Sequence, residues 1–149
     1  TARRIALTIY LLDINLLLAL TDPMHVHHEL SHQWFAKKGR KAWATCPLTE
    51  NGFVRIASHP NYPNRPGDVP AVLSILRQVC GSPGHHFWAD DLSILDILTP
   101  NAIITHAQIT DVYLLGLAIH NKGKLATLDQ RIPVNAVRGG RQALEIITA

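Results

Sequence analysis

Short apolar runs alternate with longer amphipathic segments along most of the chain. The run from residue 5 to 12 is partly β-branched, which is typical of a strand buried on both faces. The same pattern predicts shorter strands at 42–45, around 87–88, at 124–128 and at 144–147, the last at a sheet edge.

Helices are predicted between these strands, at 14–20, 25–38, 47–57 and 69–79, briefly after 91, and at 105–121. Pro47 suits the first turn of one helix, and Asp68 is a suitable N-cap for another. Gly39 is an expected helix end. The prolines in 58–67 predict a loop.

Strands that alternate with helices predict a mostly parallel sheet with helices on both faces. The sequence therefore indicates an α/β protein, built as a three-layer α/β/α sandwich of Rossmann-like type. Its 149 residues are enough for a substantial core in a single domain that spans 1–149.

Four acidic residues stand where an apolar segment ends or a helix begins: Asp13, Glu50, Asp111 and Asp129. Asp13 and Asp129 follow predicted strands, and the other two lie in helices whose first turns can point to the same sheet edge. Ligands of open α/β sheets bind beyond the carboxyl ends of the strands. Converging carboxylates suit a hard divalent cation such as Mg²⁺ or Mn²⁺. We therefore expect one acidic cleft that serves phosphodiester hydrolysis.

Composition adds little to this expectation. A hydrophobic content of 47% and a charged content of 17% indicate an ordered globular protein. The formal charge of +3 mildly favours a polyanionic partner. Cys46 and Cys80 are too few for a disulfide framework, so both are expected to be reduced.

Arg3 and Arg4 precede an apolar run that imitates a secretory signal, but Asp13 interrupts that run. No apolar stretch of about 18 residues follows that could cross a bilayer. We expect a cytoplasmic protein without a membrane partner.

The acidic segments together resemble those of PIN-domain nucleases, in order and in spacing. The matching segments are Tyr-Leu-Leu-Asp-Ile-Asn-Leu-Leu-Leu-Ala-Leu at 10–20, Pro-Leu-Thr-Glu-Asn-Gly-Phe at 47–53, Thr-Asp-Val-Tyr-Leu-Leu at 110–115, and Leu-Ala-Thr-Leu-Asp at 125–129. Within that family the chain is most similar to VapC-type toxins, the ribonuclease halves of bacterial toxin–antitoxin pairs.

The resemblance implies a PIN-like fold, dependence on Mg²⁺ or Mn²⁺, an RNA substrate, a homodimer and a cognate antitoxin. It implies that Asp13 and Asp111 bind the metal directly, and that Glu50 and Asp129 act through water. It assigns no role to the loop at 58–67 or to the segment at 85–91. One-metal and two-metal hydrolysis both remain open.

Neighbouring polar residues are expected to support these acids. Asn15 is placed to hydrogen-bond Asp13, and Thr110 or Thr127 to do the same for a nearby acid. Arg55 and Arg131 are candidates for RNA phosphate contacts, or for bracing the acidic cluster.

Other readings of the sequence predict different functions. Each acid by itself is equally suited to cap a helix or to form a turn. A catalytically idle PIN-like module would bind RNA or a protein without cutting it. His28-Glu29-Leu30-Ser31-His32 matches the H-E-x-x-H pattern of zinc peptidases, although no third ligand is evident.

Overall fold

The computed structural model describes residues 7–149. Within them, five parallel strands form one sheet in the order β3-β2-β1-β4-β5. The strands are β1 (Tyr10–Leu12), β2 (Trp43–Thr45), β3 (His85–Phe87), β4 (Lys124–Thr127) and β5 (Leu144–Ile146). The expected sheet is therefore confirmed, and all of its described pairings are parallel.

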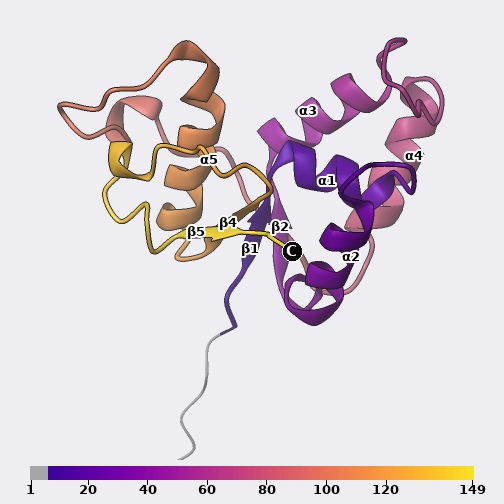
Figure 1. The fold of residues 1–149 in the computed structure, drawn as a ribbon, viewed down its shortest axis with the longest axis horizontal. Coiled ribbons are helices and arrows are strands. Elements are labelled where there is room, and N and C mark those ends of the chain that lie inside the picture. The colour runs from indigo at the N-terminus through magenta and orange to yellow at the C-terminus, as the bar shows by residue number, and fades with distance from the viewer. Residues whose placement is uncertain (1–6) are drawn as a thin grey trace, which may run out of the picture.

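Helices cover both faces of this sheet, so the three-layer prediction is confirmed. The helices are α1 (Ile14–Thr21), α2 (His28–Lys37), α3 (Pro47–Ala57), α4 (Val69–Cys80) and α5 (Ile109–His120). Helices α1 to α4 lie on one side, and α5 lies on the other with the short helical turns at 94–96, 106–108 and 134–136 (Figure 1).

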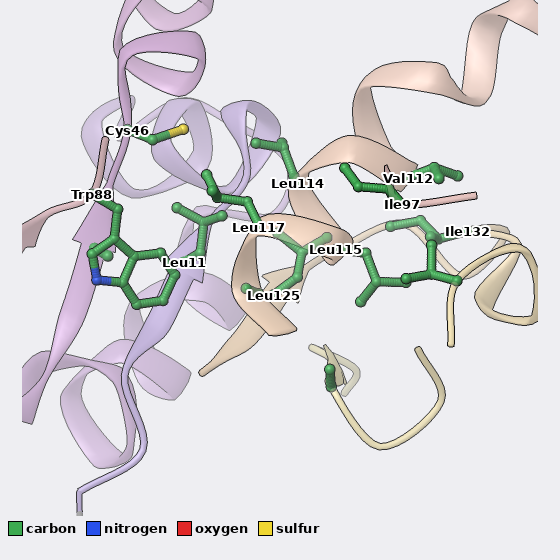
Figure 2. Close-up of a cluster of buried hydrophobic side chains, with 14 of the residues drawn as sticks. Leu11, Cys46, Trp88, Ile97, Val112, Leu114, Leu115, Leu117, Leu125 and Ile132 are labelled. Atoms are coloured by element: carbon green, nitrogen blue, oxygen red, sulfur yellow. The ribbon is translucent and has the colours of Figure 1, made fainter. Parts of the chain in front are cut away.

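Each face of the sheet has its own hydrophobic core, because successive strand residues point to opposite faces. Leu11 of β1 and Leu125 of β4 pack with α5 residues such as Leu115 in one core, part of which Figure 2 shows. Tyr10 and Leu12 point the other way. They join the second core with residues of α1, α3 and α4.

Several element boundaries differ from the sequence prediction. The strand predicted at 5–12 begins only at Tyr10, the first residue with pairing partners in β2 and β4. Residues 5 and 6 lie outside the described part of the chain. The helix predicted at 25–38 begins at His28. It follows a turn in which the backbone N–H groups of His25 and His28 donate hydrogen bonds to carbonyl oxygens three residues earlier. The helix predicted at 105–121 opens with a 3₁₀ turn before α5.

Other boundaries agree with the local chemistry. Pro47 occupies the first turn of α3, and Asp68 caps α4 by accepting from the Ala71 N–H. The segment 58–67 has no helix or strand, as its prolines predict. Among the described helices, none has the length and apolar character that crossing a bilayer requires.

Candidate active site

Asp13 is buried at the carboxyl end of β1, where it caps α1. The residue is 4% exposed, and its Oδ1 accepts from the Leu16 N–H at 2.8 Å. Strand alternation places Leu12 on the face of α1 to α4, so the next residue turns toward the α5 face. The Asp13 carboxylate is therefore aimed into the layer that α5 covers.

Thr127 joins Asp13 to Asp129 on that same face. Thr127 ends β4, and its buried hydroxyl donates to Asp13 Oδ2. The Thr127 hydroxyl oxygen also accepts from the Asp129 N–H at 3.0 Å. Asp129 Oδ1 in turn accepts from the Arg131 N–H at 2.8 Å. The sequence suggested Thr127 as a neighbour of an acid, and the structure makes it the link between two.

Asp111 enters the group from the first turn of α5. Burial raises the pKa of Asp13 to about 6, and Asp111 and Asp129 contribute smaller increases by repulsion. Burial also raises the pKa of Asp111, again with repulsion from Asp129. Asp13, Asp111 and Asp129 are thus within electrostatic reach of one another.

The carboxylates of this acidic group, which consists of Asp13, Asp111 and Asp129, repel one another in the absence of a counter-charge. In the described part of the chain, no Lys or Arg forms an ion pair with any of its members. Burial makes such repulsion costly unless a cation neutralises it. Oxygen donors alone favour a hard divalent ion.

Glu50 contacts a different set of side chains. Its Oε2 accepts from the Thr45 hydroxyl at 2.7 Å and lies 4.0 Å from the Cys80 sulfur. Thr45 follows Ala44, whose side chain joins the α5-side core, so Thr45 faces the opposite layer. The carboxylate of Glu50 therefore contacts the sheet through Thr45, on the face that α1 to α4 cover, and its role in a shared metal site stays a prediction.

The remaining predicted site residues occupy the surface. Asn15 and Thr110 are exposed, and among the hydrogen bonds of residues 7–149 neither side chain takes part in one. The bonds that hold Asp13 come from Leu16 and Thr127 instead. Arg55 and Arg131 are exposed and form no ion pair within the described residues.

The H-E-x-x-H segment lacks a third metal ligand. The rings of His28 and His32 lie 5.6 Å apart on α2, and His28 Nδ1 is 2.7 Å from the Ala19 carbonyl oxygen. Within residues 7–149, the grouping of three possible ligands consists of Glu50, Cys80 and His85 instead. The structure gives the zinc-peptidase reading no support.

Sequence reasoning missed the contact of His85 with Glu50 through Thr45. His85 Nε2 lies 2.7 Å from the Thr45 hydroxyl oxygen. Once β2 and β3 are paired, alternation places Thr45 and His85 on one face. The sequence carries no signal for that pairing, because it depends on strand order.

Comparison with known proteins identifies the family. The chain is 40% identical over 131 residues to ribonuclease VapC44 of Mycobacterium tuberculosis, which covers 87% of this chain and 92% of that protein. Ribonuclease VapC38 of the same organism is 40% identical over 141 residues, or 93% of this chain and 97% of that protein.

The chain belongs to the VapC ribonuclease family. The resemblance inferred from the acidic segments is thereby confirmed. A search of protein-family models found no match.

Solved VapC structures share the fold. The VapBC2 structure from Rickettsia felis, bound to a promoter DNA fragment, aligns with a TM-score of 0.55 at 15% identity over 94% of this chain and 99% of that chain. Mycobacterium tuberculosis VapC20, a toxin that cleaves the sarcin–ricin loop, aligns with a TM-score of 0.59 at 7% identity over 86% and 95%. At such identities the likeness supports the PIN-like fold alone.

Proposed function

We propose that this VapC family member is a metal-dependent endoribonuclease and the toxin of a toxin–antitoxin pair. The observation that carries the proposal is the acidic group, in which Thr127 links the buried Asp13 to Asp129, in a chain 40% identical to a VapC ribonuclease. Asp13 and Asp111 are oxygen donors whose pKa values burial raises, which fits a site for a divalent cation.

Asp13 and Asp111 would hold Mg²⁺ or Mn²⁺, with Asp129 beside them. A bound cation of this kind lowers the pKa of a coordinated water and offsets charge on the phosphate. The chain's own residues fix the ligands. The Leu16 N–H and the Thr127 hydroxyl hold the two oxygens of Asp13, and Thr127 and Arg131 hold Asp129.

The direct test is cleavage of RNA by purified protein with Mg²⁺ or Mn²⁺. Asp13→Asn should reduce cleavage by roughly 100-fold or more, because metal stabilisation of the developing charge is worth several kcal/mol. Asp68→Asn is the matched control, since Asp68 also caps a helix by accepting from a backbone N–H. This control should cleave like the wild type.

Two other outcomes would contradict the proposal. Equal cleavage by wild type and Asp13→Asn would point to a contaminating nuclease. RNA binding without cleavage would favour the catalytically idle module.

The proposed partners are a cognate antitoxin and a second copy of this chain. VapBC2 of Rickettsia felis is a complex in its solved structure, which supports the first of these by analogy. Co-expression with the product of the adjacent gene should yield a complex in which cleavage is inhibited. Sedimentation of the purified protein would measure the homodimer.

A further inference from the structure

Two hydrogen bonds made by one hydroxyl connect the edge strand β3 to Glu50. Thr45, the last residue of β2, places its hydroxyl oxygen 2.7 Å from Glu50 Oε2 and 2.7 Å from His85 Nε2. Thr45 is fully buried, whereas Glu50 and His85 are half-buried. Water therefore does not reach the Thr45 hydroxyl, and its bonds are made in a medium that strengthens them. We refer to these two bonds as the Thr45 bridge.

The single proton of the Thr45 hydroxyl fixes the direction of both bonds. A Glu50 carboxylate can only accept, so Thr45 donates its proton to Glu50 Oε2. The Thr45 oxygen is left with lone pairs, and it accepts the proton carried by His85 Nε2. Accepting this bond polarises the hydroxyl and strengthens its own donation to the carboxylate. His85 thus acts on Glu50 through Thr45.

Packing holds the Nε2 atom of His85 toward Thr45. The centroid of the His85 ring lies 4.7 Å from that of the buried Trp43, its pairing partner on β2. Gly84, just before the strand, has a φ of +88°, and a Cβ there would lie 2.3 Å from the Arg40 carbonyl oxygen. This turn requires glycine, and it sets the point at which β3 begins.

The Thr45 bridge lies beside the strand end that carries Asp13. Strands β1 and β2 are neighbours, and their register places Thr45 level with Leu12, one residue before Asp13. Among the hydrogen bonds of residues 7–149, those accepted by the Glu50 carboxylate use Oε2. The other carboxylate oxygen, Oε1, is therefore left for a water or a cation.

We propose that His85 is a positioning residue for Glu50 and acts through the hydroxyl of Thr45. The inference rests on the proposed function, because it takes Glu50 as one of the acids that serve metal-dependent cleavage. A free glutamate side chain samples several rotamers. The Thr45 bridge holds Oε2 and so fixes the direction in which Oε1 points. Residues that orient metal ligands typically contribute about 10- to 100-fold to metal affinity or activity.

Two amide substitutions of His85 separate its donor from its bulk. The amide nitrogen of Gln can occupy the position of the His Nε2 atom, whereas that of Asn reaches only as far as Nδ1. With RNA and Mn²⁺, His85→Asn should therefore lower kcat about tenfold with an unchanged KM for RNA. His85→Gln should keep most of the wild-type kcat. His86→Asn is the matched control and should cleave like the wild type, because His86 pairs with Ala44 and points to the opposite face.

A double substitution tests whether His85 acts through Thr45. Thr45→Val keeps the shape of the side chain, removes the hydroxyl and should lower kcat by a similar factor, and Thr45→Ser should recover most of the loss. In the Thr45→Val background, His85→Asn should cause no further loss, because the bond that it removes no longer exists. Additive losses in the double variant would overturn the inference.

Mn²⁺ affinity gives a readout that needs no cleavage. Titration followed by the electron paramagnetic resonance signal of free Mn²⁺ should show weaker binding in Glu50→Gln and, by a smaller factor, in His85→Asn. His85→Gln should bind Mn²⁺ like the wild type. Equal defects in His85→Asn and His85→Gln would trace to lost packing against Trp43, and would overturn the donor role.

The outcomes distinguish this inference from the proposed function. If the wild type cleaves RNA and Glu50→Gln does not, wild-type kcat and Mn²⁺ affinity in His85→Asn would overturn this inference alone. If the wild type does not cleave RNA, the proposed activity fails, and the Mn²⁺ titration still decides the role of His85. Full Mn²⁺ affinity and cleavage in Glu50→Gln would remove Glu50 from the site, and would overturn the inference with it.

Discussion

At the scale of single residues, Asp13 meets two opposed demands. As an N-cap it stabilises α1, and the Thr127 hydroxyl and the Leu16 N–H hold its oxygens. As a buried charge beside Asp111 and Asp129 it is destabilising. The proposed cation site would account for this conflict, because proteins commonly exchange stability for function at such sites.

The first prediction follows from that conflict. The pKa of Asp13 rises to about 6 from 3.8, mainly through burial, so the folded state binds the proton more tightly than the unfolded state does. Stability should therefore fall as the pH rises from about 4 to about 6, and stay lower above that range. In metal-free buffer at pH 7, Asp13→Asn should be more stable than the wild type, by roughly 3 kcal/mol at most.

Urea denaturation with a chelator present, measured from pH 4 to pH 7, checks this prediction. The advantage of Asp13→Asn should shrink toward pH 4, because the wild-type carboxyl is then protonated in the folded state. An advantage that does not change with pH would show that the ionised carboxylate of Asp13 is not its source.

The second prediction concerns Thr127. Thr127→Val keeps the shape of the side chain but removes the donor to Asp13 and the acceptor for the Asp129 N–H. Cleavage or metal affinity should fall about 10- to 100-fold, as is typical for residues that orient metal ligands. Thr127→Ser restores the hydroxyl and should recover most of the loss. Equal defects in both variants would indicate a packing effect instead.

At the scale of elements, the segment 58–67 is held to the end of α1. Asp22 Oδ2 accepts from the Tyr62 hydroxyl at 2.7 Å and from Asn64 Nδ2 at 3.0 Å. Burial raises the pKa of Asp22, but the bonds from Asn64, Tyr62 and Met24 outweigh it and lower the pKa overall. A loop that the sequence leaves without a role is thus anchored by a charged acceptor.

Tyr62→Phe should therefore destabilise the protein by about 1–2 kcal/mol, because a hydrogen bond to a charged group is lost. Chemical denaturation at pH 7 measures the change. Tyr10→Phe is the matched control, since the described residues offer the Tyr10 hydroxyl no hydrogen bond. A loss in the control as large as that in Tyr62→Phe would mean that the Asp22 bond contributes nothing specific.

At the scale of the whole molecule, charge is unevenly distributed. The formal charge is +3, yet three acids gather at one end of the sheet. The rest of the surface is correspondingly more basic. Arg131 lies in the chain between Asp129 and residues 132–136. Those residues, with residues 99–103, line a surface hollow of about 570 Å³. The Arg131 side chain is exposed. The bond to Asp129 is donated by the backbone N–H of Arg131, so it does not depend on the guanidinium.

The fourth prediction concerns RNA affinity. In the Asp13→Asn background, Arg55→Ala and Arg131→Ala should each weaken RNA binding and lower the slope of log affinity against log salt by about one, because fewer counterions are released. Arg77→Ala is the control, since Arg77 is exposed in the last turn of α4. Titrations at several salt concentrations measure the slopes. If both test variants keep the slope of the background, these arginines do not contact RNA phosphates and the RNA binds elsewhere.

Much of this molecule follows from the sequence alone. Apolar runs, proline and the Asp68 cap predict the elements, because those signals act between residues close in the chain. The acids at the ends of these elements predict the family, which close relatives confirm. The termini of the elements are less predictable, because ladder partners and turns set them, as at Tyr10 and His28.

Tertiary structure alone decides which acids meet. Asp13 joins Asp129 because β1 and β4 are neighbours and Thr127 faces the same layer as Asp13. The rotation of α3 about its axis is fixed by the burial of Phe53 and by the tight approach of Gly52 to Ile14. That rotation turns Glu50 toward Thr45. Spacing along a chain cannot reveal this, because helix rotation and strand order depend on packing between segments far apart in sequence.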